Sequence, residues 1–153
     1  MKKIESFLVD HRTLMPGVYI ARIDGDVITY DLRMCKPNTG ILLDNSTMHS
    51  VEHMFATLVR NSRISDDVVY FGPMGCQTGF YLLVRDKISK DEVLDIIKNV
   101  LNDILAYDGE IFGYSDRECG NYRSLKLEAA KQACNDFLSK IKNLENIKKY
   151  SEL

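Results

Sequence analysis

One amphipathic helix limits what this chain can fold into. Residues 89–92 read Ser-Lys-Asp-Glu, a capping box that predicts the start of a helix. Apolar side chains then recur at helical spacing: Val93, Ile96, Ile97, Val100, Leu101, Ile104 and Leu105. Because a helix with one continuous apolar face must bury that face, the chain needs a second layer for this helix to pack against.

Two β-rich runs near the start of the chain provide part of that layer. They span residues 18–23 and 27–34, and the Asp-Gly-Asp turn between them predicts a hairpin. In the second run, apolar residues at even positions alternate with Thr29, Asp31 and Arg33, which predicts a half-buried strand. Two further strands are predicted over residues 67–71 and 80–85.

Two more helices complete the expected architecture. The first is predicted over residues 46–61, with Ser46 or a neighbour as its cap, and the last over residues 124–144, with a lysine-rich end that frays. No linker, repeat or low-complexity tract divides the sequence, so residues 1–153 are predicted to form a single domain. The expected fold class is α+β, with a mostly antiparallel sheet packed against about three helices in a two-layer sandwich.

Charge and cysteine content restrict the partners. The 20 Lys and Arg residues and 22 Asp and Glu residues leave a net charge of -2 without a basic run, so no nucleic acid partner is expected. No stretch of about 18 apolar residues is present to span a membrane, and the N-terminus lacks the apolar segment of a secretion signal. The four cysteines form no C-x-x-C pair, which favours free thiols in the cytoplasm.

The candidate chemistry begins with two of the three histidines. His49 and His53 stand four positions apart inside the first predicted helix, and Glu52 lies between them. Four residues advance a helix by about 400°, so both imidazoles project from one face and can bind one metal ion. The pattern H-x-x-E-H is typical of a metal site with a carboxylate base. The alternative is a pair of ordinary polar residues on a solvated helix face.

A catalytic metal site needs a third protein ligand and one open position. Cys119, in the run Glu-Cys-Gly-Asn-Tyr, is the predicted third ligand. Cys134 falls on the apolar face of the last predicted helix, where a cysteine is typically a small buried hydrophobic residue. Cys35, at the end of a strand, can equally belong to the core.

Cys76 differs from the other cysteines because it lies in a glycine-rich loop, residues 72–79. Gly75 and Gly79 provide little side-chain cover, so the thiol can be exposed at the mouth of a site. Cys76 is either a general acid and base or a cysteine without a chemical role.

Five sequence blocks together resemble the S-ribosylhomocysteine lyase family, LuxS. They occur in the family's order along nearly the whole chain, at residues 6–11, 32–38, 49–53, 73–81 and 119–122. The most specific block reads Pro-Met-Gly-Cys-Gln-Thr-Gly. Its joint occurrence with H-x-x-E-H and a downstream Cys-Gly-Asn-Tyr identifies the chain as a member of this family.

The resemblance implies one divalent metal ion per subunit, bound by His49, His53 and Cys119. Fe²⁺ is the implied native ion, and Zn²⁺ or Co²⁺ can replace it, because two imidazole nitrogens and one thiolate suit all three. Glu52 and Cys76 are implied to be the proton-transferring residues. The residues implied to hold the substrate are Ser6, His11 and Arg33.

A reaction and an assembly are also implied by the resemblance. Homocysteine is attached to carbon 5 of a ribose and leaves by β-elimination, after the sugar carbonyl has migrated from carbon 1 to carbon 3. Cys76 would serve the early isomerisations and Glu52 the elimination, which leaves 4,5-dihydroxy-2,3-pentanedione, the precursor of autoinducer-2. Arg33 either anchors the homocysteine carboxylate or orients the thiolate. The site is implied to be completed across a homodimer interface.

One departure and two competing functions complete the sequence-based hypotheses. Many family members carry a histidine close to the position of Leu125, so any contact of that histidine is in doubt here. An inverzincin peptidase shares H-x-x-E-H, but such peptidases have a larger scaffold and a distant glutamate ligand. A binding module with a structural zinc would use Cys76 as the fourth ligand.

Overall fold

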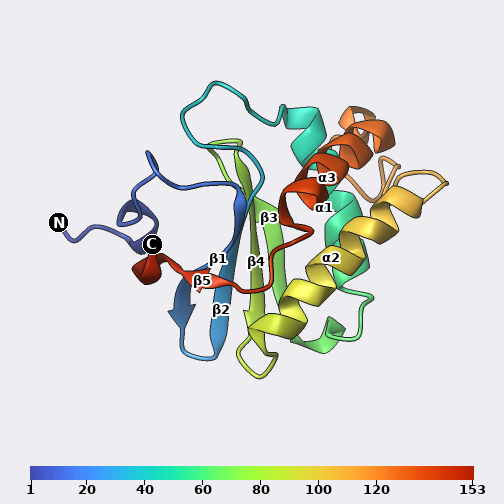
Figure 1. The fold of residues 1–153 in the computed structure, drawn as a ribbon. Helices are drawn as coiled ribbons and strands as arrows, with labels where there is room; N and C mark the ends of the chain where they lie inside the picture. Colours follow the sequence, from blue (N-terminus) through green and yellow to red (C-terminus); the bar gives the residue numbers. More distant parts are fainter.

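The structure, a computed structural model, describes residues 1–153 and has two layers, a five-stranded sheet and three helices on one of its faces (Figure 1). The strands are β1 (Gly17–Asp24), β2 (Val27–Arg33), β3 (Val68–Pro73), β4 (Gly79–Arg85) and β5 (Lys148–Lys149). The helices are α1 (Asn45–Val59), α2 (Lys90–Ala106) and α3 (Leu127–Ile141). The strand order is β3-β4-β2-β1-β5, and only β5 runs parallel to its neighbour. The predicted α+β class with a mostly antiparallel sheet is confirmed.

Strand β2 lies at the centre of the sheet because it pairs on both sides. Asp24 of β1 pairs with Val27 across a tight turn, in which Gly25 takes a φ of +59°, a left-handed conformation that favours glycine. The predicted hairpin is thus confirmed. On its other side β2 pairs with β4 along its whole length, and the pairing ends where Arg33 lies opposite Gly79.

The core lies between the sheet and the helices. Helix α2 begins at the predicted cap, since the hydroxyl of Ser89 accepts a hydrogen bond from the backbone N–H of Glu92. Its buried residues are Val93, Leu94, Ile96, Ile97, Val100, Leu101 and Ile104. Together with Tyr30 and Leu32 of β2 they belong to one cluster of 32 buried residues. None of the three helices combines the length and apolarity needed to cross a bilayer.

Helix α1 starts one residue earlier than predicted. Its cap is Asp44 rather than Ser46, because the Asp44 carboxylate accepts a hydrogen bond from the backbone N–H of Thr47 at 2.7 Å. The hydroxyl of Ser46 instead donates to the backbone carbonyl of Ser124, next to the last helix. The start of α1 is thereby joined to the segment that precedes α3.

The last helix is shorter than predicted. Helix α3 begins at Leu127, because Tyr122–Ser124 form a separate short helix, η3, and Leu125 follows it in an extended conformation. Leu125 is only 4% exposed and packs in the core. Beyond Ile141 the chain does not continue as a fraying helix, since it turns back and forms β5 beside β1.

The central strand is buried on both faces, so the prediction of a half-buried strand is wrong. Since Tyr30 and Leu32 face the helices, Asp31 and Arg33 point to the opposite face, yet they are only 0% and 1% exposed. Both terminal segments lie on that side of the sheet (Figure 1). Strand β5 leads into a short helix, η4 (Tyr150–Glu152), whose first side chain contacts Asp31.

Candidate functional site

Helix α1 carries all three residues of the H-x-x-E-H pattern. His49 and His53 lie one turn apart and are half-buried, with ring centroids 4.7 Å apart and ring planes at 88°. Glu52, also half-buried, lies close enough for its charge to act on His49. The opposite side of α1, including Val51 and Met54, is buried in the core, so packing fixes the helix that presents these side chains.

Hydrogen bonds define the tautomer of both imidazoles. The Nδ1 atom of His53 lies 2.8 Å from the carbonyl oxygen of Phe112, which can only accept, so Nδ1 carries the hydrogen. The Nδ1 atom of His49 lies 2.6 Å from the hydroxyl of Ser124. That hydroxyl donates its own hydrogen to the carbonyl of Asn121, so the Nδ1 atom of His49 is again the donor. In the neutral form of each ring the Nε2 atom is therefore unprotonated and able to bind a metal ion.

Cys119 completes a group with the donor set of a metal site. Its Sγ atom lies 3.3 Å from the Nε2 atom of His49, and one ligand atom from each of His49, His53 and Cys119 lies within 4.8 Å of the others. A nitrogen at about 2.1 Å and a sulfur at about 2.3 Å from one tetrahedral ion stand about 3.6 Å apart. The group therefore fits a metal ion, for which His49, His53 and Cys119 would be three protein ligands.

The surroundings of His49 favour its neutral form. Burial lowers the pKa of His49 below its ordinary value of 6.5, and the neighbouring His53 lowers it further, whereas Glu52 acts in the opposite direction. Neutral imidazole is the form that binds a metal.

A glycine shapes the loop around His53. Gly113 follows Phe112 and has a φ of +74°, and a Cβ atom at this position would lie 2.8 Å from the Nδ1 atom of His53. Only glycine combines this backbone conformation with such a close approach. The loop between α2 and α3 can thus bring a backbone carbonyl to one histidine and a thiol to the other.

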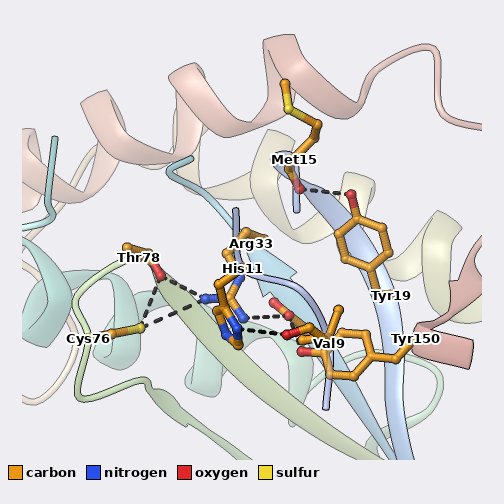
Figure 2. A network of polar contacts seen from close by, with 9 residues as sticks. Val9, His11, Met15, Tyr19, Arg33, Cys76, Thr78 and Tyr150 are labelled. Atoms are coloured by element: carbon orange, nitrogen blue, oxygen red, sulfur yellow. Dashed lines mark hydrogen bonds and ion pairs between the residues drawn. The ribbon is translucent and has the colours of Figure 1, made fainter. Parts of the chain in front are cut away.

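Cys76 belongs to a second group of polar residues, at the end of the sheet. It lies between β3 and β4, and its thiol is exposed, as predicted. The Sγ atom lies 3.0 Å from the Oγ1 atom of Thr78 and 3.8 Å from the Nη1 atom of Arg33 (Figure 2). The same Nη1 atom donates to the Oγ1 atom of Thr78 at 2.8 Å. Because Thr78 accepts from Arg33, its hydroxyl hydrogen can be donated to the sulfur.

Arg33 is held by a buried carboxylate. Its Nη2 atom lies 2.7 Å from the Oδ2 atom of Asp31, and the two side chains are 2% and 0% exposed. Burial alone would lower the pKa of Arg33, but the charge and hydrogen bond of Asp31 raise it above its ordinary value. The guanidinium therefore stays protonated. This burial excludes a solvated position for Arg33 on the sheet.

The N-terminal segment carries the other two predicted residues. Ser6 lies in a short helix, η1 (Glu5–Phe7), and its side chain makes no hydrogen bond within this chain. His11 donates from Nδ1 to the carbonyl of Val9 at 3.0 Å. Burial raises the pKa of Asp31 above its ordinary value, and His11 is among the neighbours that act in the opposite direction, so His11 lies near the buried ion pair.

Within one chain the group of His49, His53 and Cys119 and the group around Cys76 are separate. His49 and His53 are on α1, which lies on the helical side of the sheet (Figure 1), and Cys119 approaches them there. Cys76 instead contacts Arg33, which points to the other face. No hydrogen bond or ion pair joins the two groups. Of the twelve surface cavities, four with volumes of about 290 to 540 Å³ are lined by other residues than these five.

Comparison with known proteins decides the family. The family model described as S-Ribosylhomocysteinase (LuxS) matches residues 4–148. The chain belongs to the LuxS family.

Curated relatives of this LuxS chain are aligned over nearly their full length. The S-ribosylhomocysteine lyase of Finegoldia magna is 45% identical over 150 residues, which cover 95% of each chain. The enzyme of the same name from Borreliella burgdorferi strain ZS7 is 40% identical over 155 residues, 97% of this chain and 99% of the relative. The predicted family and the prediction of an enzyme are confirmed.

The thiols of this LuxS family member divide as their sequence positions suggested. Cys35 and Cys134 are buried, and burial raises the pKa of Cys134 to about 12, which makes it an inert core residue. Cys76 does not join Cys119 in the ligand group of the same chain, which argues against a closed four-ligand zinc site.

Several contacts of the LuxS site were missed by sequence reasoning. Thr78 lies in the most specific sequence block and Asp31 is two positions before Arg33 on one strand face, so both had a usable signal. Ser124 and Gly113 had none, because their contacts with the histidines bridge segments far apart in the chain.

Proposed function

We propose that this chain is a metal-dependent lyase that cleaves S-ribosylhomocysteine into homocysteine and 4,5-dihydroxy-2,3-pentanedione. The curated relatives are named for this substrate. The observation that carries the proposal is the convergence of His49, His53 and Cys119, with both Nδ1 atoms used as donors elsewhere and both Nε2 atoms available. A peptidase of the inverzincin class would need a glutamate ligand, and this ligand group contains a cysteine instead.

The proposed cofactor is one Fe²⁺ per subunit, held by His49, His53 and Cys119, and Zn²⁺ or Co²⁺ can replace it. Two nitrogens and one thiolate are a borderline-soft donor set that suits these ions. When bound, the ion supplies a Lewis acid beside the oxygens of the sugar, which makes the neighbouring C–H bonds more acidic.

The side chains provide the proton transfers. Each migration of the carbonyl, from carbon 1 to carbon 2 and then to carbon 3, takes a proton from the carbon beside the carbonyl and returns one to the old carbonyl carbon. We assign these transfers to Cys76, whose exposed thiol has a hydroxyl and a guanidinium beside it. Glu52 then takes the proton from carbon 4, and the electron pair expels the homocysteine sulfur from carbon 5.

The two polar groups meet, in this proposal, across a homodimer interface. Because one chain holds them on different sides of its sheet, the group around Cys76 in each subunit would face the metal ligands of the other subunit. The exposed thiol supports this arrangement, as do the exposed apolar side chains of the N-terminal segment, of which Phe7 is 69% and Leu8 60% exposed.

The residues proposed to act on the substrate without moving protons are Ser6, His11 and Arg33. Ser6 and His11 have hydrogen-bonding atoms that this chain does not use, so they can bind the substrate. Arg33 is almost completely buried and both of its Nη atoms are bonded within the protein. We therefore assign it to orienting the thiol of Cys76 rather than to anchoring the carboxylate of homocysteine.

The cellular compartment is proposed from the thiols. All four cysteines are unpaired, and two of them, Cys76 and Cys119, are assigned roles that need the reduced form. The cytoplasm keeps such thiols reduced, so we place the enzyme there.

The first test is anaerobic release of homocysteine from S-ribosylhomocysteine by protein loaded with Fe²⁺ or Co²⁺. We expect release that requires the metal and falls about 100-fold or more in Glu52→Gln and in Cys76→Ala. Glu128→Gln, which changes an exposed glutamate on α3, is the matched control and should keep full activity. Folded, metal-loaded protein that releases no thiol would refute the proposed reaction.

A mixing experiment tests whether the site is shared between subunits. Chains with Glu52→Gln and chains with Cys76→Ala should each be inactive alone, but a mixed dimer would contain one site with both residues intact. Random pairing of equal amounts should therefore restore about one quarter of the wild-type activity. Mixtures that remain inactive, although mass spectrometry detects mixed dimers, would place both residues of a site on one chain.

A further inference from the structure

The C-terminal segment, residues 148–153, contacts a side chain of the polar group around Cys76. The hydroxyl of Tyr150 donates a hydrogen bond to the Oδ2 atom of Asp31, on the face of the sheet opposite the helices (Figure 2). Pairing of β5 with β1 brings Tyr150 to this position. Its neighbours Lys149 and Ser151 are exposed, whereas Tyr150 is half-buried, so of these three side chains only that of Tyr150 turns inward.

A series of hydrogen bonds connects Asp31 to the sulfur of Cys76. The Oδ2 atom of Asp31 also accepts from the Nη2 atom of Arg33, whose Nη1 atom donates to Thr78, and Thr78 contacts Cys76. A carboxylate only accepts and a guanidinium only donates, so the donor and the acceptor of each hydrogen bond between Asp31 and Thr78 are fixed. Burial and the charge of Asp31 raise the pKa of Tyr150 above its ordinary value of 10.0, so its phenol stays a donor.

Stability alone does not account for this arrangement. The Oδ1 atom of Asp31 and the Nε atom of Arg33 have no hydrogen-bond partner. A buried ion pair with unpaired polar atoms stabilises a fold no better than apolar side chains of similar volume. What the pair does provide is a fixed place for the guanidinium beside Thr78 and the sulfur.

Only one phenol binds this pair, although three lie near it. The charge of Asp31 acts on Tyr19, Tyr81 and Tyr150, which surround it from β1, β4 and η4. The hydroxyl of Tyr19 is directed elsewhere, to the carbonyl of Met15 at 2.7 Å, and that of Tyr81 makes no hydrogen bond with the protein. Tyr150 therefore holds Asp31 by a contact that its neighbours do not supply.

We propose that Tyr150 is a positioning residue for Cys76, because by holding Asp31 it fixes the guanidinium of Arg33 against Thr78 and the sulfur. A guanidinium fixed beside the sulfur stabilises the negative charge that the sulfur carries when it reacts as a nucleophile. This inference rests on the proposed role of Cys76 in proton transfer. It gives the C-terminal segment a part in the chemistry without any contact with the substrate.

The test measures how fast iodoacetamide alkylates Cys76 in zinc-loaded protein without substrate, with each thiol followed by peptide mass spectrometry. Tyr150→Phe removes only the hydroxyl that binds Asp31, and we expect alkylation of Cys76 to become about fivefold slower. The matched control is Tyr19→Phe, which removes a phenol hydroxyl from a ring whose centroid lies 6.4 Å from that of Tyr150. It should leave the rate unchanged.

A general loosening of the fold would change the alkylation rates in the opposite direction. It would expose the buried Cys35 and Cys134 and accelerate alkylation of several thiols together. Slower reaction at Cys76 alone supports the proposal. An unchanged rate in Tyr150→Phe, an equal slowing in Tyr19→Phe, or faster reaction of the buried thiols would overturn it. Because alkylation needs no substrate, its outcome is independent of whether the protein is a lyase.

Discussion

The hydroxyl of Ser124 lies 2.6 Å from the Nδ1 atom of His49 and at the same time donates to the carbonyl of Asn121. It therefore accepts the hydrogen of His49, which leaves the Nε2 atom of that ring facing the sulfur of Cys119. Ser124 is the last residue of η3. The next residue, Leu125, is extended and is buried in the core. The orientation of His49, a proposed metal ligand, is thus tied to η3, which lies between Cys119 and α3.

Ser124→Ala should weaken zinc binding about 10- to 100-fold, because partners of this kind orient a ligating histidine and raise its basicity. Competition with a chromogenic chelator measures the affinity. Ser139→Ala is the matched control, since its hydroxyl also donates to the carbonyl three positions earlier but contacts no histidine. Equal affinities in the two variants would show that the contact with Ser124 does not support the metal.

Gly113→Ala should impair zinc binding through His53. The new Cβ atom would lie 2.8 Å from Nδ1 of that ring, and the backbone has a φ of +74°. The left-handed conformation alone costs an alanine about 1 kcal/mol. Gly40→Ala separates the two effects, because Gly40 has a φ of +79° and nothing within 4 Å. Both variants should lose similar stability in urea, and only Gly113→Ala should lose zinc affinity; the hypothesis fails if the two bind zinc alike.

Asp31→Asn should destabilise the protein by about 3 kcal/mol or more, because it leaves the buried charge of Arg33 without its partner. Denaturant unfolding of the metal-free protein measures the loss. Asp24→Asn breaks a similar pair with an arginine two positions away, but that pair is about half exposed, so no measurable loss is expected. Comparable unfolding curves for the two variants would contradict a buried, charged pair at Asp31.

Asp44→Ala should destabilise helix α1, and with it the histidines, by about 1 kcal/mol at pH 7. The backbone N–H of Thr47 lowers the pKa of Asp44 below its ordinary value of 3.8. Because the folded pKa lies below the unfolded one, this contribution is complete above about pH 4 and is lost as the pH falls through the folded value. Unfolding of metal-free protein at pH 7 and pH 3 should show the difference shrinking. Asp44→Asn, which caps without titrating, should stay near wild type at pH 7.

Local patterns were sufficient for the parts of the fold that depend on neighbours in the chain. The Ser89 cap, the apolar face of α2 and the turn at Gly25 were all predicted, because capping, helical periodicity and tight turns involve residues a few positions apart. The limit to near neighbours also explains why the start of α3 was predicted too early. The start depends on the packing of Leu125 in the core, and helical periodicity carries no information about that contact.

The candidate site also has features that local sequence patterns predict and features that only the fold determines. A helical spacing of four placed His49 and His53 on one face, and the family blocks pointed to Cys119, which the structure brings to within 3.3 Å of His49. Which nitrogen of each histidine is available was not readable, since it depends on Ser124 and the carbonyl of Phe112. Those partners come from a loop whose path is set by packing.

By itself the sequence determined the type of each main element, the family and the residues able to bind a metal, because these are properties of composition, spacing and short motifs. Only the tertiary structure decided that Asp31 and Arg33 are buried. Strand alternation places them on the outer face, but burial depends on what covers that face, and here Tyr150 covers it from 119 residues away in the chain. Long-range cover of this kind is a property of the folded chain and leaves no periodic trace in the sequence.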